Sequence, residues 1–224
     1  GDLETVTALT HNNRRPVVEI SLRSGRAVKV TMNHPLRVLN ERGAIVWREA
    51  KEIVAGDTLV SATFGAVEPA GGEHLSEDEA VLLGYLVAEG SLSSPNTVGF
   101  TNKDDEVGTE FCDLMGGLFD ARVKRCGDKE YRVHSKKIRT ELAERFGLGY
   151  VTAAGKSVPN CVRVGGHKAQ RAFLSALFEG DGWIDASSTI GLASASQQLA
   201  QQVQLMLYGL GVPCSLSAKF NSDY

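Results

Sequence analysis

The sequence repeats itself at a spacing of 92 residues, and this repeat constrains the fold more than any other feature. No gap is needed to align the two copies, and glycines and carboxylates coincide as well as apolar residues, which argues against chance similarity. The coinciding pairs are Leu82 with Leu174, Leu86 with Phe178, Glu89 with Asp181, Gly90 with Gly182, Val98 with Ile190, Gly99 with Gly191, Phe100 with Leu192, Val107 with Leu199, Met115 with Leu207 and Leu118 with Leu210. The repeat predicts two halves with the same order of helix, strand and helix, related by a pseudo-twofold axis. Such an arrangement suits a partner that is itself nearly twofold, such as duplex DNA.

Local patterns assign helices and strands to the two halves. Ser76 and Glu79 form a capping-box pattern, and an apolar run follows from Ala80 to Ala88, which predicts a helix. Further helices are predicted at 104–119, 135–146, 168–178 and 196–210, with short β-rich segments at 97–101 and 189–193. The region after residue 74 is therefore expected to mix helices and strands.

Small residues one helical turn apart indicate how the first helices of the two halves meet. Gly84 with Ala88, and Ala176 with Gly180, create flat faces on which two helices can approach closely. Parallel pairing would bring Glu89 and Asp181 together at the C-terminal ends, and each acid is followed by a glycine that can end its helix.

Two carboxylates at the negative ends of two helices repel the helix dipoles and each other, so a purely structural role does not explain them. Bound divalent cations would reverse this repulsion. Hard cations with oxygen ligands, Mg²⁺ above all, would also bind phosphate oxygens and water. The acid pair of Glu89 and Asp181 therefore predicts metal-dependent phosphodiester hydrolysis.

The N-terminal third has a different pattern. Strands are predicted at 17–22, 27–31, 36–39 and 44–47, so residues 1 to 66 indicate a small all-β domain. A stretch with glycine and proline, Gly65 to Glu73, is predicted as a linker. The fold class expected for the whole chain is α+β.

Composition restricts the remaining classes. No apolar run approaches the length of a membrane span and no signal segment begins the chain, so we expect a cytoplasmic protein without a membrane partner. The four cysteines form no close pair of the kind that binds zinc, and buried reduced thiols are expected. The net charge of −3 does not itself indicate a nucleic-acid binder. Basic residues do outnumber acidic ones between Arg122 and Arg145, a cluster that taken alone is read as a solvated face with mixed charges.

The paired segments 82–90 and 174–182 resemble the signature helices of the LAGLIDADG homing endonucleases, and the resemblance covers roughly residues 75 to 220. It implies a pseudo-twofold αββαββα fold over residues 74–224, with repeats at about 76–150 and 167–224. The second repeat is truncated, because the counterpart of residues 124–156 would lie at 216–248. The resemblance also implies a monomer that cuts double-stranded DNA at a long asymmetric site.

What the family implies for single residues follows from the same motifs. Glu89 and Asp181 take the positions of the metal-binding acids, with Gly90 and Gly182 beside them at a site for Mg²⁺, for which Mn²⁺ is a possible substitute. Lys156 matches a lysine that assists the water network of the active site, although an exposed loop lysine is the alternative. Family sheets form a saddle over DNA, which implies contacts from the polar strands 93–102 and 131–134. The candidate DNA-binding residues are Lys124, Arg125, Arg132, His134, Lys136 and Lys137.

A second resemblance concerns the β region. Residues 30–36 resemble the Thr-x-x-His block of inteins and hedgehog-type self-processing (Hint) domains, and 53–60 resemble the strand that follows it. This implies a partial Hint domain over residues 1–70, with His34 and Thr31 as splicing residues and host exteins as partners. The sequence begins with Gly1 rather than Cys or Ser and lacks a closing His-Asn, so this chain alone is expected not to splice.

The sequence thus predicts a metal-dependent homing endonuclease within an intein. One alternative is a DNA-binding protein that keeps the fold without cutting, which retention of both acids argues against. Another is a splicing protein with a degenerate endonuclease. A purely structural scaffold comes last, because it explains neither the acid pair nor the repeat.

Overall fold

The computed structural model describes residues 7–8, 13–61 and 75–218, and the chain divides into two compact units. One unit comprises residues 1–65 and 207–224, and the other comprises residues 66–206. The chain is α+β, as predicted. The predicted linker, Gly65 to Glu73, lies outside the described residues.

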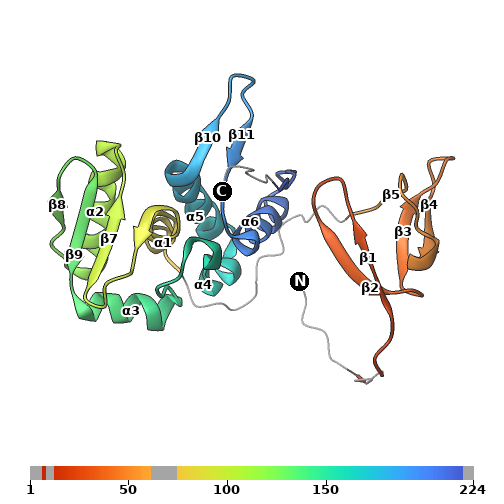
Figure 1. The fold of residues 1–224 in the computed structure, drawn as a ribbon, viewed down its shortest axis with the longest axis horizontal. Helices are drawn as coiled ribbons and strands as arrows, with labels where there is room; N and C mark the ends of the chain where they lie inside the picture. The colour runs from red at the N-terminus through yellow and green to blue at the C-terminus, as the bar shows by residue number, and fades with distance from the viewer. Residues whose placement is uncertain (1–6, 9–12, 62–74, 219–224) are drawn as a thin grey trace, which may run out of the picture. The chain divides into compact units, whose positions relative to one another are not determined.

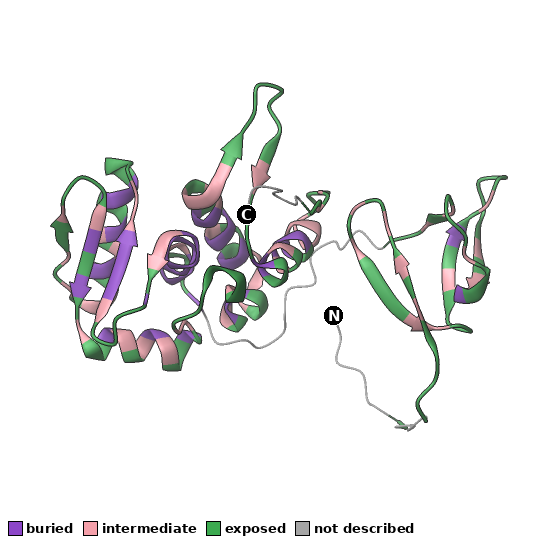
Figure 2. Ribbon diagram, in the orientation of Figure 1, coloured by how far each residue is buried: buried purple, intermediate pink, exposed green. Residues whose placement is uncertain are grey.

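Two helices form the centre of the larger unit. Helix α1 (Glu77–Glu89) and helix α5 (Gly166–Asp181) pack along each other (Figure 1). Helix α1 begins at the predicted capping box: Ser76 Oγ accepts from the amide of Glu79, and the Glu79 carboxylate accepts from the amide of Ser76. Figure 2 shows that most of α1 is buried, which suits a helix enclosed on several sides.

The seam between α1 and α5 is built from the predicted small residues. A methyl group added at Gly84 would lie 2.7 Å from Cβ of Ala176, and one added at Gly180 would lie 2.6 Å from Cβ of Ala88. Both distances are too short for two carbon atoms, so each contact requires one glycine. The contacting residues are the ones that coincide in the repeat, which means that the pseudo-twofold axis runs through this seam.

The first half adds a four-stranded antiparallel sheet in the order β6-β7-β9-β8. Its elements are β6 (Gly90–Ser91), β7 (Thr97–Thr101), α2 (Asp105–Phe119), β8 (Lys124–Cys126), β9 (Glu130–His134) and α3 (Lys136–Phe146). Along β7 and β9 the side chains of Val98, Phe100, Tyr131 and Val133 are buried on one face of the sheet. Helix α2 covers this face, and the ring of Phe100 stacks on that of Phe111 at 4.5 Å. The structure thus leaves the opposite face of the sheet for polar side chains.

The second half repeats this order as far as the described residues reach. A 3₁₀ turn at Ala153–Gly155 and helix α4 (Asn160–Val164) lead into α5, and they are followed by β10 (Gly182–Ile184), β11 (Ile190–Leu192) and α6 (Gln197–Gly209). Strands β10 and β11 form an antiparallel hairpin. The predicted helices agree with the observed ones within about two residues, whereas α4, β6, β8 and β10 were not predicted. None of the described helices is long and apolar enough to cross a membrane.

The smaller unit is built from strands, as predicted for the N-terminal region. They are β1 (Val17–Ser21), β2 (Ala27–Thr31), β3 (Pro35–Leu39), β4 (Ile45–Glu49) and β5 (Thr58–Leu59), with a 3₁₀ turn at Ala50–Glu52. Strands β1 and β2 pair as one hairpin, and β4-β3-β5 form a second sheet. Among the described residues of this unit only Val38 and Ala50 are buried apolar side chains, so its core is small.

Candidate active site

The structure brings Glu89 and Asp181 to the C-terminal ends of the two central helices. Each is the last residue of its helix, and each side chain is half-buried. Burial raises the pKa of the Glu89 carboxyl, and the nearby charge of Asp181 raises it further. Burial also raises the pKa of the Asp181 carboxyl. The two acids therefore form one electrostatically unfavourable pair.

Gly90 and Gly182 end the two helices in extended backbone rather than in the left-handed conformation common at helix ends. Their φ and ψ angles are −75° and 145°, and −79° and 161°. Glycine is needed here for a different reason: a Cβ at Gly90 would collide with the carbonyl oxygen of Leu86, and one at Gly182 with that of Phe178. The chain turns directly from helix into strand, which leaves both acids at the junction.

Lys156 lies beside the acid pair. Its Nζ donates a hydrogen bond of 2.6 Å to the carbonyl oxygen of Ala88, the residue before Glu89. Its positive charge lowers the pKa of both the Glu89 and the Asp181 carboxyls, against the effect of burial. A cation on the last carbonyls of α1 also offsets the negative end of the helix dipole. The structure thus places the predicted lysine next to both predicted acids.

Helix α6 holds the segment that carries Lys156, which sequence reasoning missed. Ser196 Oγ donates to the carbonyl oxygen of Lys156 at 2.5 Å, and Gln202 Oε1 accepts from the amide of Val158 at 2.8 Å. The sequence held one signal for Ser196: it lies 92 residues after Asp104, which caps α2. The contact to a loop 40 residues away had no such signal.

Polar and basic side chains occupy the sheet face opposite α2, which we call the open face and define by Lys124, Arg132, His134, Thr97 and Ser91. The register pairs Arg132 with Lys124 on one side and with Gly99 on the other. His134 pairs with Thr97, whose Oγ1 lies 3.0 Å from His134 Nδ1. Lys124, Arg132 and His134 are exposed, so the open face presents donors to solvent.

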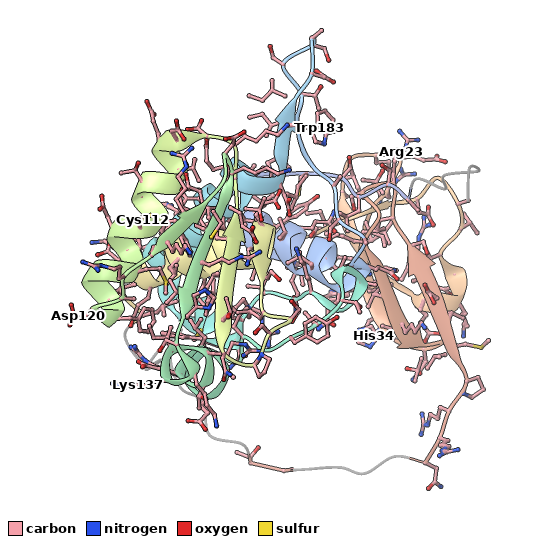
Figure 3. The ribbon with its side chains drawn as sticks, turned by 60° about the vertical axis from the view of Figure 1, so that its left-hand side comes forward. Arg23, His34, Cys112, Asp120, Lys137 and Trp183 are labelled. Atoms are coloured by element: carbon pink, nitrogen blue, oxygen red, sulfur yellow. The ribbon has the colours of Figure 1, made fainter. Side chains whose placement is uncertain are left out.

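The other candidate DNA contacts are placed elsewhere. Arg125 alternates to the helix-covered side, where its guanidinium pairs with Asp105 at 2.6 Å and lies over the Tyr131 ring. Lys136 and Lys137 occupy the first turn of α3 beyond the sheet, and Figure 3 shows Lys137 on the outer side of that helix. The six predicted residues therefore form one face only for Lys124, Arg132 and His134.

The two splicing candidates lie in the smaller unit. Thr31 ends β2 and is half-buried, and the amide of exposed His34 donates to the Thr31 carbonyl oxygen at 2.9 Å. They are adjacent across the turn that connects β2 to β3.

The acid pair has the donor set of a hard divalent cation. No group of three or more His, Cys, Asp or Glu side chains that could hold a metal is found among the described residues. Mg²⁺ does not need one, because it binds through one or two carboxylates and takes its other ligands from water and phosphate. Two half-buried acids with raised pKa values therefore fit Mg²⁺ better than a metal enclosed by protein ligands.

Comparison with known proteins agrees with this geometry. Residues 168–223 match the family model of the LAGLIDADG-like domain. The chain contains a LAGLIDADG-like domain. The match to this LAGLIDADG-like domain includes α5, Asp181 and the β10–β11 hairpin.

Two curated relatives match almost all of the chain. The replication factor C small subunit of Methanocaldococcus jannaschii is 30% identical over 92% of the chain and 11% of the relative. A DNA gyrase from Mycobacterium malmoense is 31% identical over 95% of the chain and 48% of the relative. The chain spans less than half the length of either.

Among solved structures, a mesophilic variant of the homing endonuclease I-DmoI is 23% identical, with a TM-score of 0.47 over 63% of this chain and 75% of that chain.

Proposed function

We propose that this protein is a site-specific endonuclease that cuts double-stranded DNA with divalent metal ions. The observation that carries the proposal is the pairing of Glu89 and Asp181 at the ends of α1 and α5, with Lys156 beside them. Burial raises the pKa of both carboxyls, a cost that metal binding repays. No structural benefit of the pair offsets that cost in the described residues around it.

The carboxylates of Glu89 and Asp181 would hold Mg²⁺, or Mn²⁺ in its place, and the carbonyl oxygens of Gly90 and Gly182 are the nearest main-chain ligands along the chain. A bound divalent ion supplies an activated water molecule and neutralises charge on the leaving oxygen. Lys156 adds a fixed positive charge near the same place. The protein's own part is to hold these groups in position.

The open face would bind the DNA. Lys124, Arg132 and His134 present donors suited to phosphates and base edges, and the sheet that carries them starts at Gly90, directly after Glu89. Binding on this face leads the duplex towards the acid pair. The two halves carry different side chains at equivalent positions, which suits a long asymmetric site read by a monomer.

We further propose that the endonuclease is lodged in an intein. The chain matches two proteins with different names, one a DNA gyrase and the other the small subunit of replication factor C, over more than 90% of its length. It covers only a minority of each. A segment shared by otherwise different proteins is expected of an insertion that moves between hosts. Thr31 and His34 would then assist splicing, with the host segments as exteins.

Plasmid cleavage tests the endonuclease proposal. The plasmids carry host genes of the matched kinds with the insertion removed, and each is incubated with the protein in Mg²⁺ or in Ca²⁺. We expect one double-strand cut in Mg²⁺, and a loss of at least about 100-fold in rate for Glu89→Gln and for Asp181→Asn. Tight specific binding without any cut would instead indicate a degenerate DNA-binding protein.

Splicing has its own test. A precursor that carries this segment between host sequences is expressed with and without His34→Ala. We expect ligated host product from the first and strongly reduced product from the second, with His167→Ala as a control outside the β unit. Equal amounts of product from both precursors would remove His34 from the splicing mechanism.

A further inference from the structure

Helix α6 grips the Lys156 segment at two points. Ser196 is fully buried, and its hydroxyl donates to the carbonyl oxygen of Lys156. Gln202, further along the same helix, accepts from the amide of Val158. The backbone on both sides of Ser157 is thereby tied to one rigid element.

The other end of the lysine is also held. Its Nζ donates to the carbonyl oxygen of Ala88, so the side chain spans from the α6 contact to the end of α1. A free lysine side chain carries about 2 kcal/mol of rotamer entropy, and tying its backbone leaves fewer conformations to lose. The reach of Lys156 therefore depends on where α6 holds its carbonyl.

The repeat shows what is special about Ser196. The coinciding residue in the first half is Asp104, whose carboxylate caps α2 by accepting from the amides of Glu106 and Val107. Ser196 likewise accepts, from the amide of Leu199. A hydroxyl can accept and donate together, whereas a carboxylate only accepts. Only serine in this pair can cap its helix and also hold a loop.

We propose that Ser196 is a positioning residue for Lys156, which directs the ammonium group to the end of α1 beside Glu89 and Asp181. The catalytic meaning of this inference rests on the proposed endonuclease function. The positioning itself does not, and it can be measured without DNA.

The first experiment measures the reactivity of the Lys156 amine. The whole protein is acetylated with a limiting reagent, and modification of each lysine is followed by mass spectrometry. We expect Ser196→Gly to raise the Lys156 rate several-fold, because the carbonyl anchor is lost while glycine still tolerates the cap position. Ser196→Thr keeps the hydroxyl and is expected to restore the wild-type rate.

Asp104→Gly is the matched control. It changes the equivalent cap in the first half by the same chemistry, but Asp104 holds no lysine segment. We expect this variant to leave Lys156 reactivity unchanged while shifting the melting temperature about as much as Ser196→Gly. If Ser196→Gly does not fold, Gln202→Met provides a second break of the same segment, with the same expected rise. An unchanged Lys156 rate in the folded variant would overturn the inference.

The second experiment connects positioning to cleavage. Single-turnover rates in Mg²⁺ are measured for Ser196→Gly, Lys156→Met and the double variant, with DNA affinity measured in Ca²⁺. We expect Ser196→Gly to slow cleavage about tenfold at unchanged affinity, an effect of the size seen when supporting contacts of a metal site are lost. The double variant should be no slower than Lys156→Met alone, because both changes act through one lysine.

The two experiments separate the possible failures. If Lys156 reactivity rises but the wild-type protein cuts no DNA, the positioning role stands and the endonuclease function fails. If the wild-type protein cuts and the two changes slow cleavage independently, Ser196 does not act through Lys156.

Discussion

At the scale of single residues, the acid pair shows a conflict between stability and function. Glu89 and Asp181 are half-buried at the negative ends of two helices, and Lys156 compensates them only in part. Active sites keep such groups because their use comes with the substrate and its metal ions. The cost should therefore be visible in the stability of the metal-free protein.

The first prediction concerns Glu89→Gln in the absence of metal. The raised pKa of Glu89 means that the folded protein binds the proton more tightly than the unfolded chain, so stability falls as pH rises through the interval above the ordinary glutamate pKa. Near pH 7 the Gln variant should be more stable in urea unfolding, by on the order of 1 kcal/mol or less because half-buried charges are screened. Below about pH 4 the difference should vanish.

Glu144→Gln, a change at an exposed position on α3, is the control and should show no comparable gain. A wild-type protein that is as stable as Glu89→Gln at neutral pH would contradict the prediction. Saturating Mg²⁺ should reverse the order, because only the wild type gains from binding.

At the scale of helices and sheets, the sequence predicted elements better than contacts. Ser76 and Glu79 marked the start of α1 because a capping box is local, and the repeat placed Glu89 and Asp181 at equal positions. The side of the sheet on which Arg125 lies was not predicted, because it depends on the register of β8 with β9. The link from Ser196 to Lys156 was missed because it joins residues far apart, and no periodic pattern records such a bond.

The α1–α5 seam carries the second prediction. Gly84→Ala should lower the free energy of unfolding by about 1–3 kcal/mol, because the new methyl group meets Ala176 at 2.7 Å. Gly117→Ala is the matched control: it lies in helix α2, and nothing lies within 4 Å of its added Cβ. That change should be neutral or stabilising by up to about 1 kcal/mol. Equal effects of the two substitutions in thermal unfolding would show that the seam is not tightly packed.

The open face carries the third prediction. If Arg132 and Lys124 each contact a phosphate, replacing either with alanine should reduce the slope of log affinity against log salt by about 0.9. Lys137→Ala, on α3 beyond the sheet, should leave the slope unchanged. Binding is measured by fluorescence anisotropy in Ca²⁺ over a series of salt concentrations. A larger slope change for Lys137 than for Arg132 would move the DNA contact to α3.

At the scale of the whole molecule, the two halves match in backbone order but differ in charge. The sheet of the first half carries Lys124 and Arg132 on its open face. The hairpin of the second half, residues 182–192, contains no Lys or Arg and includes Asp185. Hydrogen bonds from Ser187 and Thr189 lower the pKa of Asp185, so it remains negative.

This asymmetry leads to the fourth prediction. Randomising the half-site beneath the first half should weaken binding roughly tenfold more than randomising the other half-site, the equivalent of one mismatched base pair at about 1–3 kcal/mol. Hydroxyl-radical footprinting of the bound DNA should show stronger protection on the same side. Equal losses and an even footprint would mean that the β10–β11 hairpin contributes as much as the four-stranded sheet.

The order of small residues in the seam also determines which partners the halves accept. Gly84 faces Ala176, and Ala88 faces Gly180, so each level holds one methyl group, and the two helices supply it in turn. Two copies of α1 paired together would press two methyl groups against each other at residue 88 and leave a void at residue 84. Two copies of α5 would fail in the same way with the levels exchanged. The duplicated halves have thus become complementary and are no longer interchangeable, and a homodimer made from either half would first need its alanine level changed to glycine.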